Sequence, residues 1–116
     1  LTSTASLAEL ERQVGRAVPM DRFRPNLVID GAAAYEEDEH LAVRVGALRF
    51  RMPKRCVRCQ VTTIDQSTGE ARGPEPLRSL AITRRVGGGA AFGQNLVPVD
   101  EGTVAVDDAV SWDRVD

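Results

Sequence analysis

The stretch LAVRVGALRFRM, residues 41–52, decides the fold class, because apolar side chains alternate with others along it. The alternating apolar residues are Leu41, Val43 and Val45 before Gly46-Ala47, and Leu48, Phe50 and Met52 after it. Alternation at every second position is typical of a strand with one buried face, and a glycine between two such runs suits a tight turn. Residues 41–52 are therefore predicted to form a β-hairpin.

One short helix is predicted on each side of the hairpin. Ser6 and Glu9 match the S-x-x-E pattern of a capping box, in which a hydroxyl and a carboxylate each satisfy a free backbone amide. Apolar residues at helical spacing follow, so residues 6–16 are predicted to be an amphipathic helix. Further along, Pro76 suits the first turn of a helix over residues 76–85.

The rest of the chain predicts short strands joined by turns and loops. Strands are predicted at residues 27–29, 59–65, 95–99, 103–106 and 109–112, and a flexible or tightly turned loop at the glycine-rich residues 86–93. With the hairpin this gives about seven strands, which is typical of a β-barrel or β-sandwich. The fold class is therefore predicted to be mainly β, with short flanking helices, in a single domain.

Length and composition exclude several classes of protein. The chain has 116 residues, enough for one hydrophobic core, and its formal net charge of -2 argues against a general nucleic-acid-binding protein. No run approaches the roughly 18 apolar residues of a membrane-spanning helix, and no signal peptide is visible. With two cysteines, a reduced, cytoplasmic setting is predicted. Because the chain starts with LTSTASL and not with methionine, we expect it to be a piece of a longer protein or a processed form.

The stretch KRCVRCQVTTIDQSTG, residues 54–69, holds both cysteines, Cys56 and Cys59. Structural zinc needs four ligands, whereas the chain offers two cysteines and one histidine, His40. A thioredoxin-like pair would open a helix, but the residues after Cys59 favour a strand. The zinc site and the redox pair are therefore both disfavoured. Two readings stay open, namely buried structural cysteines and a thiolate stabilised by neighbouring cations. Those cations are Arg49, Arg51, Lys54, Arg55 and Arg58.

Six segments, in this order and at this spacing, resemble the MOSC domain, which is named after the C-terminal region of molybdenum cofactor sulfurase. They are RFRPNLVI at 22–29, YEEDE at 35–39, CVRCQVTTIDQSTG at 56–69, EPLRSL at 75–80, FGQN at 92–95 and GTVAVDDAV at 102–110. The resemblance is greatest to the amidoxime-reducing component type. It implies that residues 1–116 are the C-terminal portion of a MOSC domain whose upstream part lies outside this chain. The pattern departs from the family at His40, where an aromatic residue is usual, and at Asp107-Asp108, where the family has Gly-Asp.

The resemblance implies a MOSC-type β-barrel that binds the molybdenum cofactor, a pterin dithiolene with a terminal phosphate. In the amidoxime-reducing type, the second cysteine of the C-x-x-C stretch coordinates the metal, and that position is Cys59. Cys56 matches the first cysteine, which is not a ligand in that type. Arg24 and Asn26, in the RFRPN segment, match positions that contact the cofactor.

The residue types agree with these implied roles. Molybdenum in a sulfur environment accepts a thiolate such as that of Cys59, and the planar fork of a guanidinium such as Arg24 suits a phosphate. If residues 59–65 form a strand, alternation places Thr63 on the same side as Cys59. Thr63 is therefore a further candidate to orient the cofactor.

The implied function is an oxidoreductase in which molybdenum reduces N-hydroxylated compounds, with electrons from a separate electron-transfer protein or a fused iron-sulfur domain. The alternative is a module that carries the cofactor or a persulfide to another enzyme. Sulfurases of the family carry a pyridoxal-phosphate cysteine desulfurase domain ahead of the MOSC part. A third reading, an interaction domain without cofactor, is disfavoured by Arg24, Asn26 and Cys59. No membrane or nucleic-acid partner is expected.

Overall fold

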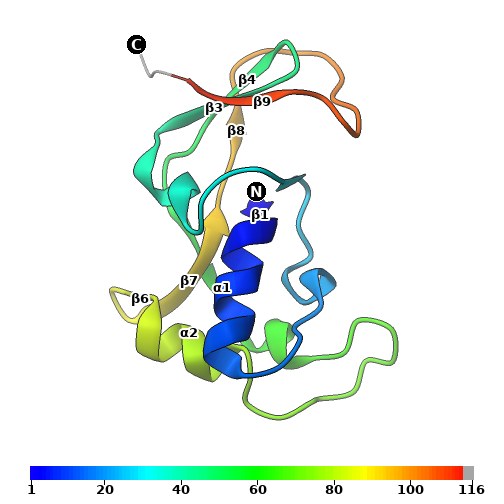
Figure 1. Ribbon diagram of the computed structural model, residues 1–116, viewed down its shortest axis with the longest axis vertical. Coiled ribbons are helices and arrows are strands. Elements are labelled where there is room, and N and C mark those ends of the chain that lie inside the picture. The colour runs from blue at the N-terminus through cyan, green and yellow to red at the C-terminus, as the bar shows by residue number, and fades with distance from the viewer. Residues whose placement is uncertain (114–116) are drawn as a thin grey trace.

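The computed structural model describes residues 1–113, which form two α-helices, three 3-10 helices and nine short strands (Figure 1). The helices are α1 (Thr4–Val14), α2 (Leu77–Thr83), η1 (Met20–Phe23), η2 (Glu36–Glu39) and η3 (Gln60–Thr63). The strands are β1 (Thr2–Ser3), β2 (Val28–Ile29), β3 (Ala42–Val45), β4 (Leu48–Arg51), β5 (Arg55–Arg58), β6 (Arg85–Val86), β7 (Gly89–Gln94), β8 (Val97–Pro98) and β9 (Val110–Asp113). The predicted class, mainly β with two short helices, is confirmed.

The strands form three separate sheets. An antiparallel sheet in the order β8-β4-β3-β9 lies at one end of the molecule, and a sheet in the order β5-β7-β6 lies beside α2 (Figure 1). β1 and β2 form a two-stranded parallel pair. Within residues 1–113 no sheet closes on itself, because β8 and β9 are open edges of their sheet and the strands are short. The predicted barrel is therefore not confirmed.

The hairpin prediction is confirmed. β3 and β4 pair with Val43 opposite Phe50, and Gly46 makes the turn with a φ of +58°. Val43 is fully buried, whereas Leu41 precedes the strand and is 67% exposed. Val43 and Val45 therefore face the core as the sequence predicts, whereas Leu41 does not, and Ala42 on the other face is also buried.

The first helix begins at Thr4, two residues earlier than predicted, and Ser6 does not cap it. The N-cap is Ser3, whose side-chain oxygen accepts a hydrogen bond from the Ser6 amide at 3.0 Å. The Ser6 hydroxyl instead donates to Glu37 Oε1 at 2.5 Å, and Glu9 pairs with Arg12. The predicted capping box is wrong because a tertiary contact uses the Ser6 side chain and a local pair within α1 uses that of Glu9.

The predicted strand at residues 59–65 is also wrong. β5 ends at Arg58, and the residues after Cys59 form η3. The hydroxyls of Thr62 and Thr63 each donate to the carbonyl three residues back, at 2.9 and 2.7 Å. Such local bonds satisfy the backbone without a partner strand, so they favour a helical turn over a sheet.

The glycine-rich residues 86–93, predicted to be a loop, contain the central strand β7. Ala91 and Phe92 are fully buried, and the strand pairs with β5 and β6. A Cβ on Gly89 would lie 2.4 Å from Val57 Cγ1, so the glycine permits close packing of neighbouring strands. Of the other predicted strands, the one at residues 109–112 is confirmed as β9. The strands predicted at residues 27–29 and 95–99 are shorter than expected and correspond to β2 and β8. Residues 103–106 do not form a strand.

Gly93 provides a test of this close packing. Its φ is +81°, and a Cβ there would lie 2.5 Å from the Leu1 carbonyl oxygen. We expect Gly93→Ala to lower the free energy of unfolding by roughly 2–4 kcal/mol in urea denaturation, from left-handed strain plus overpacking. Gly87→Ala is the matched control, because Gly87 also has a positive φ but nothing within 4 Å. Equal losses in the two variants would contradict the close approach.

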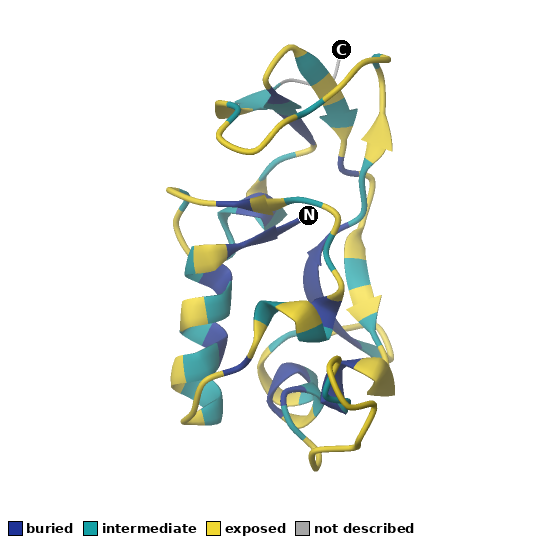
Figure 2. Ribbon diagram, turned by 90° about the vertical axis from the view of Figure 1, so that its right-hand side faces the viewer, coloured by how far each residue is buried: buried dark blue, intermediate teal, exposed yellow. Residues whose placement is uncertain are grey.

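The core has two parts. One lies between α1, α2 and β7, and its buried residues are Leu10, Val18, Phe23, Leu80, Ala90 and Phe92. The other lies under the hairpin and includes Val43, Val45 and Met52. Figure 2 shows the buried interior along β7, with exposed residues on the outer side of α1. Among residues 1–113, no helix has both the length and the apolar character needed to cross a bilayer.

Candidate functional site

Cys59 lies where β5 ends and η3 begins, and its side chain is exposed. It lines a hollow of about 320 Å³, together with Arg22, Arg24, Arg58 and Thr62. The hollow therefore places a thiol beside three guanidinium-bearing side chains and no carboxylate. The reading of two buried structural cysteines is wrong for Cys59.

Arg24 stands at the rim of this hollow in an unusual backbone conformation. It ends η1 in the left-handed region, with a φ of +46°, which non-glycine residues adopt only when the surroundings impose it. Its side chain is exposed and makes no hydrogen bond or ion pair with residues 1–113. The five N–H donors of this guanidinium are thus free for an anionic ligand.

A second hollow, of about 350 Å³, adjoins the first. It is lined by Asn26, Cys56, Gln94 and Asn95, and it shares Phe23, Arg24 and Arg58 with the Cys59 hollow. The predicted residues Arg24 and Cys59 therefore meet in one hollow, and Arg24 and Asn26 meet in the other. Cys56, which is half-buried, belongs only to the second hollow.

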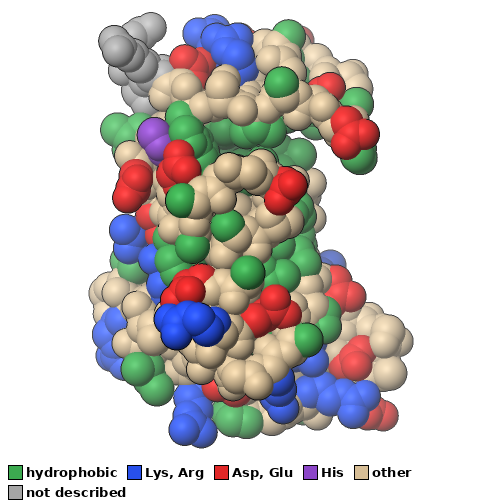
Figure 3. Space-filling model, viewed as in Figure 1, with side chains coloured by type: hydrophobic (Ala, Val, Ile, Leu, Met, Phe, Trp, Pro, Cys, Tyr) green, Lys and Arg blue, Asp and Glu red, His purple; other side chains and the backbone are tan. Residues whose placement is uncertain are grey.

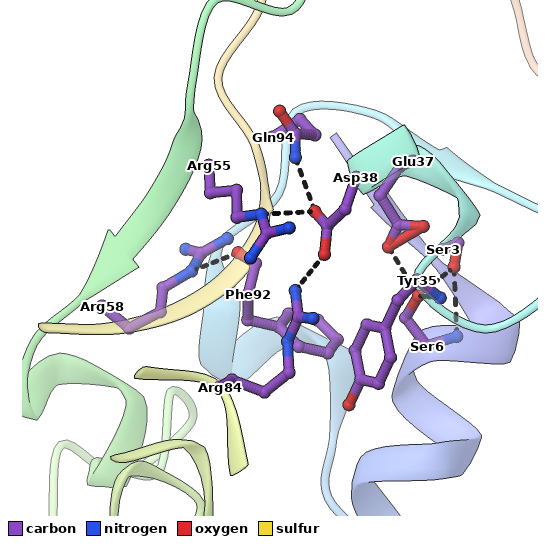
Figure 4. Close-up of polar contacts among 10 residues, drawn as sticks. All are labelled: Ser3, Ser6, Tyr35, Glu37, Asp38, Arg55, Arg58, Arg84, Phe92 and Gln94. Carbon is purple, nitrogen blue, oxygen red and sulfur yellow. Dashed lines mark hydrogen bonds and ion pairs between the residues drawn. The ribbon is translucent and has the colours of Figure 1, made fainter. Parts of the chain in front are cut away.

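Arg58, one of the five cations named beside the cysteines from the sequence, lines both hollows, a role that the sequence alone did not assign to it. Its Nε donates to the Phe92 carbonyl at 2.8 Å (Figure 4). One terminal nitrogen donates to the Phe23 carbonyl at 3.0 Å, and the guanidinium lies 5.2 Å from the Phe23 ring centre. Burial lowers the pKa of Arg58 from its ordinary value, while the adjacent Cys56 and Cys59 oppose that shift. An arginine nevertheless keeps its charge in proteins. Its position between the two cysteines of C-V-R-C was the available signal.

Thr63 does not lie where strand alternation would put it. It is buried in η3, and its hydroxyl donates to the Gln60 carbonyl at 2.7 Å. Thr62 is the threonine that lines the Cys59 hollow, and its hydroxyl donates to the Cys59 carbonyl at 2.9 Å. A 3-10 helix brings residues three apart to the same side, so Thr62 takes the place that alternation assigned to Thr63.

One buried carboxylate joins four elements of the fold (Figure 4). Asp38, in η2, forms an ion pair with Arg84 after α2 and a longer one, 3.7 Å, with Arg55 of β5. It also accepts a hydrogen bond from Gln94 Nε2 of β7 at 2.5 Å. Gln94 lines the second hollow, so Asp38 holds one wall of that hollow in place.

Asp65 organises the turn that follows η3. Its Oδ1 accepts hydrogen bonds from the hydroxyl and the amide of Ser67, at 2.6 and 2.9 Å, and from the Thr68 amide at 3.2 Å. These bonds, the Ser67 hydroxyl first, lower the pKa of Asp65 to about 2.

Because the folded pKa is lowered, the turn gains stability above the ordinary pKa of 3.8 and loses it as the pH falls through about 2. We expect the amide NMR signals of Ser67 and Thr68 to titrate with a midpoint near pH 2. A midpoint near 3.8 would show that the hydrogen bonds are absent in solution. Asp65→Asn supplies the control, since its turn has no titrating group at this position.

The residues present fit the cofactor that the resemblance implies. Residues 1–113 hold no group of three or more His, Cys, Asp or Glu side chains that could bind a metal ion unaided. A metal at Cys59 would therefore need most of its ligands from a cofactor. The unpartnered Arg24 and the amide of Asn26 provide donors for a phosphate and for a polar ring system at the same place.

Comparison with known proteins identifies the family of the chain. The sequence model of the MOSC domain matches residues 1–111. Human mitochondrial amidoxime-reducing component 1 is 35% identical over 118 residues, which cover 95% of this chain and 35% of the relative. Rat mitochondrial amidoxime reducing component 2 is 39% identical over 72% of this chain and 25% of its own length. Rice molybdenum cofactor sulfurase is 36% identical over 80% of this chain and 12% of its own length.

The matched region covers only part of each relative. The chain spans about a third of the length of the amidoxime-reducing components that it matches. The match to the domain, in contrast, runs through every residue of both hollows. This chain belongs to the MOSC domain family.

Proposed function

We infer that the chain supplies part of a molybdenum cofactor site in an oxidoreductase that reduces N-hydroxylated compounds. The observation that carries this proposal is the exposed Cys59 in a hollow with Arg24 and Arg58 and without a carboxylate. The names of the human and rat relatives support the reductase reading, since both are amidoxime-reducing components.

Each residue then has a distinct task. Cys59, as a thiolate, would coordinate the metal, and Arg24 and Asn26 would hold the phosphate and polar edges of the pterin. Arg58 would keep a positive charge next to the thiolate, which favours the anionic form of the sulfur. When bound, the cofactor supplies the redox chemistry that removes an oxygen atom from the substrate. Electrons would come from a separate electron-transfer protein or a fused iron-sulfur domain.

The structure gives less support to the proposed role of Thr63. Its hydroxyl is turned to the Gln60 carbonyl, and it lines neither hollow. Thr62 lines the Cys59 hollow, but its hydroxyl is likewise bonded to a carbonyl, that of Cys59, so it shapes the wall of the hollow and offers no free hydroxyl to a cofactor. The cytoplasmic setting also stays a prediction.

The alternative function is a module that carries the cofactor or a sulfur atom to another enzyme. The specific observation in its favour is the pair of thiols in adjoining hollows, which could hold a persulfide next to a bound cofactor. The rice relative is named as a molybdenum cofactor sulfurase. Mass spectrometry separates the two functions, because only the carrier predicts a persulfide on Cys56 or Cys59 as an isolated species.

The test begins with the natural protein that contains this chain, purified from a host that makes the cofactor. Elemental analysis should find molybdenum bound to it. The loaded protein, given a chemical reductant and an aromatic amidoxime, should produce the amidine. Full molybdenum loading without turnover of any N-hydroxylated compound would exclude the reductase function, and loading at background level would exclude the cofactor site.

A further inference from the structure

We propose that a third hollow, lined by Arg16, Arg22 and Arg72, binds the phosphate group of the substrate. This inference rests on the proposed function, and it narrows the substrate class to N-hydroxylated compounds that carry a phosphate. The hollow has a volume of about 220 Å³. That is several times the roughly 30 Å³ that one water occupies in the liquid, so a phosphate group fits in it.

The hollow is formed where residues 16–22 meet residues 72–76, which are far apart in the sequence. Arg16 belongs to the segment after α1, Arg22 to η1, and Arg72 to the long loop between η3 and α2. Lys and Arg side chains gather along the edge of the molecule next to that loop (Figure 3). The rest of the lining includes Val18 and Pro19, which provide an apolar wall.

The charges of the hollow are only partly balanced by the protein. Arg16 makes no hydrogen bond or ion pair with residues 1–113. Arg22 uses one terminal nitrogen to donate to the Thr62 carbonyl at 3.2 Å, which leaves its other donors available. Arg72 has two long, exposed ion pairs, 3.4 Å to Asp65 and 3.5 Å to Glu70. Exposed pairs of this kind are weak, so a doubly charged phosphate can compete with them.

The one carboxylate that lines the hollow is already engaged. Glu75 accepts the Ser79 amide at 2.7 Å and the Ser79 hydroxyl at 2.6 Å. These bonds hold its negative charge at the start of α2, where the helix dipole stabilises it. Among the residues that line the hollow, three arginines thus stand against one engaged carboxylate, and the two further carboxylates contact only Arg72, through its exposed ion pairs.

Arg22 links this hollow to the Cys59 hollow. It lines both the third hollow and the Cys59 hollow, and the carbonyl that it binds belongs to Thr62, which also lines the Cys59 hollow. A molecule with its phosphate between Arg16 and Arg72 can thus extend past Arg22 towards Cys59. Val61 and Phe23 along that path offer apolar contacts for its body.

Titration of the cofactor-free natural protein with inorganic phosphate tests the site, with amide NMR shifts as the readout and sodium chloride holding the ionic strength constant. We expect saturable binding that Arg16→Gln and Arg72→Gln each weaken about tenfold, the loss of one charge-assisted hydrogen bond. The matched control is Arg12→Gln, because Arg12 is an exposed α1 arginine paired with Glu9 and should leave phosphate binding unchanged.

The outcomes separate this inference from the proposed function. Unsaturable phosphate binding, or equal weakening by Arg12→Gln, would overturn the phosphate site while leaving the molybdenum proposal intact. Loss of molybdenum from Arg16→Gln would also overturn it, because the hollow would then serve the cofactor. If phosphate binds as expected but Cys59→Ala keeps its molybdenum, the anion site stands and the proposed function fails.

Discussion

Cys59→Ala is expected to remove molybdenum from the natural protein, from near-stoichiometric loading to background. Residues 1–113 offer no metal-binding cluster at this place, so the variant loses the only protein ligand that we assign to the metal. The fold should be retained, because the Cys59 side chain is exposed. Elemental analysis measures the first effect, and circular dichroism with urea unfolding measures the second.

Cys56→Ala is the matched control for this experiment. Cys56 has the same chemistry, lies three residues earlier and adjoins the second hollow, but it is not the assigned ligand. We expect it to keep its molybdenum, with at most a moderate loss of retention from the changed wall. Equal metal content in the Cys59 and Cys56 variants would refute the ligand assignment.

Asp38→Ala is expected to have the largest effect on stability, a loss of about 3–5 kcal/mol in the free energy of unfolding. The Asp38 side chain is 5% exposed and that of its partner Arg84 is 12% exposed. Removing the carboxylate leaves the buried guanidinium without a counter-charge, and Gln94 loses its acceptor. Urea denaturation followed by circular dichroism measures the loss.

Two further variants test whether the buried, unpaired charge causes the loss of stability in Asp38→Ala. Asp100→Ala breaks an arginine pair of similar geometry, with Arg49 at 2.9 Å, but on the surface, where such pairs contribute little. Adding Arg84→Met to Asp38→Ala should recover part of the stability, because it removes the unpaired charge. An Asp38→Ala variant no less stable than Asp100→Ala would mean that the network of Figure 4 does not hold the elements together.

The hairpin could be predicted from the sequence because its signal is local. Alternation over residues 41–52 and a glycine at the turn are enough to fix strand, turn and buried face together. β7 could not be predicted in the same way. Gly89 and Gly93 are typical of loops, and their role as points of close approach to Val57 and Leu1 depends on segments far along the chain.

In the candidate site, too, some residues could be predicted from the sequence and others could not. Cys59, Arg24 and Asn26 could be named from the segments that resemble the family, and the structure places them around two adjoining hollows. The contacts of Arg58 and the place of Thr62 required the structure. The first is defined by carbonyls of distant segments, and the second by a helical turn where β-branched residues predict a strand.

The stacking of Phe23 on Phe92, with ring centres 4.2 Å apart, ties the segment that carries Arg24 to the middle of β7. A packing defect at Phe92 would therefore displace the segment that carries Arg24 and weaken the binding of the ligand that Arg24 contacts. We expect a conservative truncation such as Phe92→Leu to give a heat-sensitive protein, which releases its ligand on mild warming while the sheets are still intact.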